Sequence, residues 1–250
     1  MTNLADESKF KKYGVNTKGK DYICGDIHGH FHLLHQELEN HNFDPTSDRV
    51  FCLGDLIDRG DDSSEVVSYL QQPWFHSVLG NHEQMLIDAI DISTYEHIAN
   101  WLSQGGSWAK EMSRNDLLYY YEPLTKLPLT IEIELSSGKN VGLVHANLPK
   151  NADWLSIRFL CENFSIHNPY RLDSNAKEML WSRKMHKSIG YVKNINHVFH
   201  GHTIVDKVKT INNRSYIDLG SYNTKKIGFF HIDNFLSSLE KQKQKRLAEV

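Results

Sequence analysis

The chain has 250 residues, of which 40% are hydrophobic and 24% charged, and its formal net charge is −3. This composition is typical of a globular protein, and the small net charge provides no general basic field for nucleic acid. No run approaches the roughly 20 apolar residues of a membrane span, and residues 1–20 lack a signal-peptide core. Three cysteines without metal-type spacing favour a reducing compartment. We therefore expect a cytoplasmic protein without a nucleic-acid or membrane partner.

The first half of the chain alternates short apolar runs with helical patterns. Expected strands at 22–24, 50–53 and 77–79 precede expected helices at 31–40, at 63–71 and from Glu83 onward. This order predicts a layered α/β core with parallel strand pairing.

The second half changes character at residue 94. Residues 94–121 form an aromatic-rich helical pattern, broken at Gln104-Gly105-Gly106-Ser107, and predict a helical insertion beside the site. The pattern then predicts a hairpin at 129–135 and 140–144, and two helices at 152–162 and 176–183. A strand is expected at 197–199, and the strands expected at 205–211, 215–219 and 227–232 form an antiparallel run. The last segment, 234–250, is expected to be a charged helix or tail. No repeat or linker divides the chain. We expect one domain over 1–250, with its core at about 21–233.

Hard metal ligands follow the ends of five expected strands. They are Asp26 with His28, Asp55, Asn81, His145 and His202. Carboxylate, amide and imidazole donors suit Mn, Fe or Zn better than Ca or Mg. The count supports two ions that share Asp55, and two ions roughly 3.5–4 Å apart can clamp a phosphoryl group and generate hydroxide. Periodicity does not separate His202 from His200, because both side chains of one strand point the same way.

The residues beside these ligands suit phosphate chemistry. His82 follows Asn81 directly, so it would lie at the rim and donate a proton to a leaving group. Asp58 could orient that imidazole. Arg59 and Arg183 are bidentate donors for phosphate oxygens, and Asn81 is a third phosphate-binding candidate. The aromatic residues Trp101, Trp108 and 119–121 favour core packing, with a role in a peptide groove left open.

Five sequence blocks resemble those of PPP-type phosphoprotein phosphatases. Three match the family's signature blocks in order and separation, and two match its later histidine blocks: Gly25-Asp26-Ile27-His28-Gly29, Gly54-Asp55-Leu56-Ile57-Asp58-Arg59-Gly60, Gly80-Asn81-His82-Glu83, Val144-His145-Ala146-Asn147 and Gly201-His202-Thr203. The resemblance covers about residues 21–222. Within the calcineurin-like metallophosphoesterase superfamily, the compact size, Trp181-Ser182-Arg183 and the Gly105-Gly106 insertion look most like the bacterial and bacteriophage lambda branch.

The resemblance implies a four-layer α/β/β/α sandwich and two divalent ions, most often Mn²⁺, with Fe or Zn as alternatives. It implies the same six metal ligands, selects His202 over His200, and assigns the catalytic pair to His82 and Asp58. Eukaryotic members have Gly-Gly where this chain has Ala146-Asn147. That departure puts eukaryote-like regulatory subunits in doubt.

The leading hypothesis is hydrolysis of phosphoserine and phosphothreonine monoesters in proteins by direct attack of a metal-bridging hydroxide, with phosphotyrosine left open. The alternative is a dinucleoside tetraphosphate hydrolase with a similar metal centre. A third hypothesis is a catalytically silent phosphoprotein-binding module, but no ligand or acid of the set is missing. The native substrate and the oligomeric state stay open.

Overall fold

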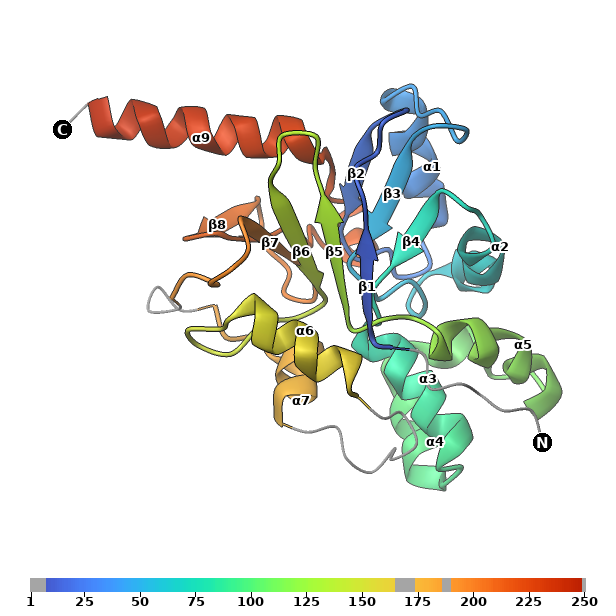
Figure 1. The fold of residues 1–250 in the computed structure, drawn as a ribbon. Helices are drawn as coiled ribbons and strands as arrows, with labels where there is room; N and C mark the ends of the chain where they lie inside the picture. The colour runs from blue at the N-terminus through green and yellow to red at the C-terminus, as the bar shows by residue number, and fades with distance from the viewer. Residues whose placement is uncertain (1–7, 165–173, 186–189, 249–250) are drawn as a thin grey trace.

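A computed structural model describes residues 8–164, 174–185 and 190–248 of the chain. Two β-sheets lie at its centre and helices lie around them (Figure 1). Within the described residues, no helix combines the length and apolarity that a membrane span requires.

The four-stranded sheet confirms the parallel α/β core. Its strand order is β10-β2-β3-β4, with β2, β3 and β4 parallel and β10 antiparallel to β2. The strands are β2 Asp21–Cys24, β3 Arg49–Cys52, β4 Phe75–Ser77 and β10 Phe229–His231. Cys24 lies opposite Cys52 in the register. The chain therefore leaves β2 and β3 at the same edge of the sheet, and the first two ligand blocks begin there.

The six-stranded sheet contains the predicted hairpin. Its order is β1-β5-β6-β7-β9-β8, and Thr130 of β5 lies opposite Val144 of β6 in antiparallel register. Its strands are β1 Phe10–Tyr13, β5 Thr130–Glu134, β6 Asn140–Val144, β7 His197–His200, β8 Lys209–Ile211 and β9 Arg214–Tyr216. Strands β6 and β7 run parallel, so the histidine blocks that follow them emerge at one edge.

Helices cover the outer faces and the edge where the ligand blocks lie. They are α1 Phe31–Asn40, α2 Val66–Leu70, α3 Asn81–Asp91, α4 Tyr95–Ser103, α5 Arg114–Thr125, α6 Trp154–Glu162, α7 Ser174–Trp181, α8 Ser221–Thr224 and α9 Ile232–Ala248, with short 3₁₀ turns η1 Asp61–Glu65 and η2 Gly106–Ala109. The insertion predicted at 94–121 is the α4-η2-α5 unit. Helix α9 projects away from the body of the molecule (Figure 1).

The sheets pack face to face through an apolar layer. Ile23 and Phe51 of the small sheet belong to the same fully buried cluster as Ile131, Leu143 and Phe199 of the large sheet. Burial of such side chains contributes roughly 1.5–3 kcal/mol each relative to exposure. On the outer face of the large sheet, Trp154 of α6 lies against Gly142, where a Cβ would meet the indole ring at 2.4 Å. The predicted four-layer sandwich is confirmed.

One prediction about strands is wrong. The expected antiparallel run at 205–211, 215–219 and 227–232 is divided between the sheets, because β8 and β9 pair in the large sheet while β10 pairs with β2 in the small one. Strand β1, which precedes the predicted start of the core at 21, pairs in parallel with β5 at the edge of the large sheet.

His76 in β4 makes folding sensitive to acid. Its ring lies 4.4 Å from the ring of Tyr13, and burial, helped by Lys11 and Arg49, lowers the pKa of His76 to about 3. The unfolded chain, with an ordinary histidine pKa near 6.5, binds more protons between these values, so stability falls as pH falls below about 6.5.

We expect this one residue to cost on the order of 2 kcal/mol of stability between pH 7.5 and pH 5. Urea unfolding at the two pH values checks this, because His76→Phe keeps the ring stacking and should reduce the loss by that amount. The exposed His35→Gln variant is the control. An equal pH dependence in His76→Phe and the wild type would contradict the assignment.

Candidate active site

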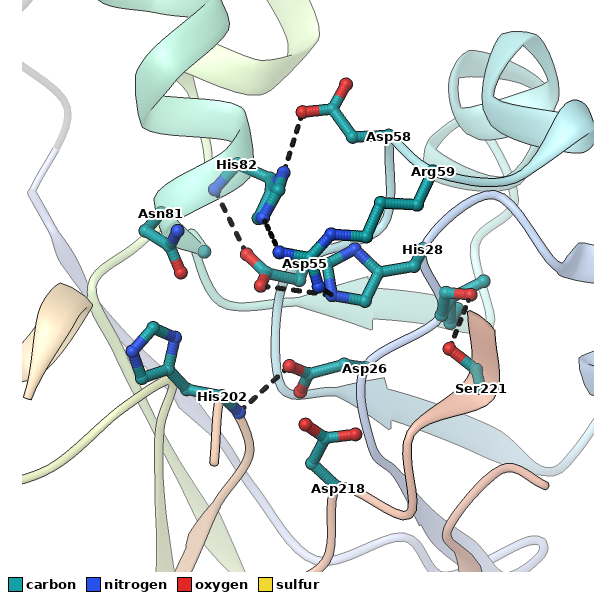
Figure 2. Close-up of polar contacts among 12 residues, drawn as sticks. Asp26, His28, Asp55, Asp58, Arg59, Asn81, His82, His202, Asp218 and Ser221 are labelled. Atoms are coloured by element: carbon teal, nitrogen blue, oxygen red, sulfur yellow. Dashed lines mark hydrogen bonds and ion pairs between the residues drawn. The ribbon is translucent and has the colours of Figure 1, made fainter. Parts of the chain in front are cut away.

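The ligand blocks of both sheets meet at one place. Asp26 and His28 follow β2, Asp55 follows β3, and His202 follows β7. Two backbone amides join these loops, since His202 N–H donates to Asp26 Oδ2 over 2.9 Å and His82 N–H donates to Asp55 Oδ1 over 3.0 Å. Figure 2 shows the resulting ring of side chains. Strand ends 176 residues apart are therefore held together by direct hydrogen bonds.

One side of the ring is formed around His145. Its Nε2 lies 2.9 Å from Asn81 Oδ1, 3.2 Å from His202 Nδ1 and 3.4 Å from Asp55 Oδ1. Its Nδ1 lies 2.6 Å from the carbonyl oxygen of Leu53, an acceptor only, so Nδ1 carries the proton. The lone pair of Nε2 therefore faces the other candidate metal-ligand atoms, as in metal-binding histidines.

The other side is formed around His28. Its Nε2 lies 3.5 Å from Asp55 Oδ2, and its Nδ1 lies 3.3 Å from the Ile57 carbonyl oxygen. Ligand atoms of His28, Asp55 and His82 lie within 4.8 Å of one another, as do those of Asp55, His145 and His202. Asp55 is the member common to both sets, and His82 stands in the set in which the sequence analysis expected Asp26. Asp26 is in neither set and borders them through its bond from His202.

These donors fit divalent cations. Burial lowers the pKa of His28 and His145, and it lowers the pKa of His202 to about 3, so all three rings are neutral ligands. Asp26 Oδ1 and His202 Nε2 are buried without a hydrogen-bond partner among the described residues. Neutral imidazoles, carboxylates and an amide oxygen around one space match the preferences of Mn, Fe or Zn.

The backbone at this site is strained. The residues with φ between 47° and 74° include three of the predicted ligands and the Asp58-Arg59 pair: His28, Asp55, Asp58, Arg59 and His202. Non-glycine residues in this region cost of order 1–3 kcal/mol each, and such strain persists where surrounding contacts enforce it. Close packing adds to the constraint, because a Cβ at Gly201 would meet Asp26 Oδ1 at 2.0 Å.

His82 and Asp58 form a buried pair. His82 Nδ1 lies 2.7 Å from Asp58 Oδ2, and neither side chain is more than 2% exposed. Burial lowers the pKa of His82, but the Asp55 charge and the Asp58 hydrogen bond and charge outweigh it, so the pKa is raised. The ring nitrogen Nε2 is left facing the metal-ligand ring.

The two predicted arginines lie at the same place. The guanidinium of Arg59 reaches His82 Nε2 at 2.9 Å and His28 Nε2 at 3.1 Å, and it lies 4.3 Å from the ring centroid of Tyr222. Arg183, just beyond α7, donates to the carbonyl oxygen of His202 over 2.7 Å. Both cations therefore border the ring of ligands.

Sequence reasoning missed Glu83. Its buried carboxylate accepts the backbone N–H groups of Asp55, Leu56, Ile57 and Gly80 at 2.7–3.2 Å. Burial and the Asp55 charge raise its pKa to about 7, against the opposing effect of the Ile57 amide. The sequence signal was weak, because an acidic residue in the first turn of α3 also reads as an ordinary helix cap.

Sequence reasoning also missed Asp218. This buried carboxylate accepts the Gly220 N–H over 2.8 Å and lies beside Asp26 (Figure 2). Burial and the Asp55 charge raise its pKa to about 6, although the Gly220 N–H lowers it. The rejected candidate His200 lies elsewhere, stacked on Tyr216 at 4.9 Å between ring centroids.

Comparisons with known proteins agree with this geometry. The family model for calcineurin-like phosphoesterases matches residues 22–206. Serine/threonine-protein phosphatase 2 of Escherichia coli (strain K12) is 31% identical over 90% of this chain and 98% of that protein. A symmetrical bis(5'-nucleosyl)-tetraphosphatase of Coxiella burnetii (strain Dugway 5J108-111) is 34% identical over 55% of this chain and 44% of that protein.

A solved structure extends the comparison to the fold. A protein serine/threonine phosphatase from Saccharomyces cerevisiae superposes with a TM-score of 0.59 at 16% identity, covering 85% of this chain and 71% of that one. The family match spans most of the chain, and its range contains five of the strands that carry or border the site. The chain belongs to the calcineurin-like phosphoesterases and is a hydrolase of phosphate esters.

Proposed function

We propose that the protein is a metal-dependent phosphoprotein phosphatase acting on phosphoserine and phosphothreonine. The observation that carries this proposal is the pair of donor sets that share Asp55, one with His28 and His82 and the other with His145 and His202. His82 of the first set also bonds to the buried Asp58. The near full-length similarity to the E. coli serine/threonine phosphatase supports the substrate class.

The residues divide into two sets of metal ligands. Asp26, His28 and Asp55 would hold one ion, and Asp55, Asn81, His145 and His202 would hold the second, with Mn²⁺ as the proposed metal. When bound, two such ions supply Lewis acidity toward phosphoryl oxygens and acidify a water molecule.

Arg59, Arg183 and Asn81 orient the phosphoryl group. A guanidinium offers two parallel N–H donors that match two phosphate oxygens. Arg59 bonds to nitrogens of two histidines, and its stacking on Tyr222 holds the planar group beside the ligand ring. Arg183, just beyond α7, is anchored on the His202 carbonyl oxygen.

His82 donates a proton to the departing oxygen of the serine or threonine. An alkoxide is a poor leaving group, so its protonation as the P–O bond breaks contributes roughly 10²–10⁴-fold. Asp58 holds the Nδ1 proton over 2.7 Å and stabilises the protonated ring. In the structure Nε2 accepts from the Arg59 guanidinium over 2.9 Å, and in the protonated ring Nε2 carries the second proton, which passes to the substrate.

The main alternative activity is hydrolysis of dinucleoside tetraphosphates, which the partial similarity to the Coxiella tetraphosphatase supports. We expect kcat/KM on a phosphoserine peptide to exceed that on diadenosine tetraphosphate by at least about tenfold. Both are measured by phosphate release with Mn²⁺ present. A preference for the dinucleotide of that size would overturn the proposed substrate class.

Asp55→Ala should remove metal as well as rate, because the variant takes one ligand from each donor set. Elemental analysis should find the variant depleted of metal, with turnover reduced by more than about 10³-fold. The exposed Asp61→Ala, which begins η1, is the matched control and should retain both ions. Full metal occupancy in Asp55→Ala would contradict the shared-ligand assignment.

His82→Asn should lower kcat for a phosphoserine peptide by about 10²–10³-fold while the metal content is unchanged. The amide keeps a hydrogen-bonding group near Asp58 but cannot deliver a proton. Steady-state kinetics and elemental analysis on one preparation check this. A kcat within about threefold of the wild type would remove His82 from the mechanism.

A further inference from the structure

Trp101 and Trp108 of the helical insertion contact the buried carboxylate of Asp58. The indole N–H of Trp108 donates to Asp58 Oδ1 over 2.8 Å, and that of Trp101 lies 3.2 and 3.1 Å from Oδ1 and Oδ2. Asp58 has no exposed surface, and His82 Nδ1 bonds to its Oδ2. The carboxylate is thus surrounded by three N–H groups, two of which come from the insertion.

The insertion also holds the backbone next to Asp58. The Arg59 N–H donates to the Gly105 carbonyl oxygen over 3.0 Å, and a Cβ at Gly105 would meet Arg59 Cγ at 2.6 Å. Asp58 and Arg59 both have positive φ, at 74° and 71°. Two consecutive strained residues require outside contacts to persist, and Gly105 provides one.

The indoles are themselves fixed. A Cβ at Gly106 would meet the Trp101 ring at 2.7 Å, so the glycine lets the backbone pack against that ring. Trp108 packs edge-on against Tyr120 of α5, with ring centroids 5.1 Å apart. Both N–H groups are therefore held in place against the carboxylate before a substrate binds.

The chemistry of the indole suits this position. An indole N–H donates a hydrogen bond but carries no charge and accepts no proton. The two indole N–H groups stabilise the buried Asp58 carboxylate. An arginine or lysine in their place would carry a positive charge and compete with the protonated His82 ring for the carboxylate. Neutral donors leave the Asp58 charge available to His82.

We infer that Trp101 and Trp108 are positioning residues that hold the Asp58 carboxylate in the orientation that the His82 proton donor needs. This inference rests on the proposed function, because it acts through that donor. It adds to the core-packing hypothesis, which the structure confirms, because Trp101 lies in the buried core and Trp108 packs against it. The N–H groups of both rings also bind the Asp58 carboxylate.

Leaving-group dependence tests the inference. Trp108→Phe keeps an aromatic ring and removes the N–H group. We expect kcat for a phosphoserine peptide to fall about tenfold, because serine departs as a poor leaving group that needs the acid. We expect kcat for p-nitrophenyl phosphate to change less than about threefold, since nitrophenolate needs little protonation, with KM for both substrates within about twofold.

Trp154→Phe is the matched control. Trp154 is buried and its indole N–H also bonds to a carboxylate, Glu132 Oε2, over 2.8 Å, but it lies behind the large sheet. Any loss of activity in this variant should be equal for both substrates. Equal losses on both substrates in Trp108→Phe would overturn the inference.

The double variant separates this inference from the proposed function. When Trp108→Phe is added to His82→Asn, kcat for the phosphoserine peptide should fall by less than about a further twofold, because the proton donor is already missing. A further tenfold loss would overturn the positioning role. Failure of His82→Asn itself to reduce phosphoserine turnover would instead overturn the proposed mechanism.

A direct readout covers the case in which a tryptophan variant does not fold. The chain has five tryptophans, and ¹⁵N-indole labelling of the zinc-loaded protein gives one N–H signal for each. Asp58→Asn should shift the signals of Trp101 and Trp108 and leave that of Trp154 in place. Unchanged Trp101 and Trp108 signals would overturn the inference.

Discussion

The carboxylate of Glu83 supports the rest of the active site. It accepts three successive amides of the loop that contains Asp55 and a fourth from Gly80, so it joins the end of β3 to the start of α3. A buried carboxylate bonded in this way costs its full desolvation penalty when a partner is lost. These bonds therefore fix the loop after β3 in one arrangement and hold Asp55 in one position.

Two sheets are needed because neither provides enough donors alone. The small sheet supplies carboxylates and one imidazole, and the large sheet supplies the two later histidines. Sheet packing through the apolar layer fixes the distance between these groups, and the His202-to-Asp26 bond sets their register. Positive φ angles at the ligands show that the strained loops are held by this frame.

Most of the candidate ligands that the structure brings together could be predicted from the sequence, because each follows a strand in one short block. The sequence pattern did not identify β1, whose Phe-Lys-Lys-Tyr segment carries two lysines and pairs with β5 about 120 residues later. The pairing of β10 with β2 was missed for a different reason, because periodicity reveals a strand but not the strand beside it. The contacts of Glu83, Trp101 and Trp108 depend on side-chain direction, which spacing does not encode.

In the proposed function, the contacts of Asp58 with a separate helical unit separate proton donation from metal binding. Metal binding belongs to the two-sheet frame, whereas the surroundings of Asp58 belong to α4 and η2. Sequence drift in that unit can therefore retune which alcohols depart readily without altering cation affinity.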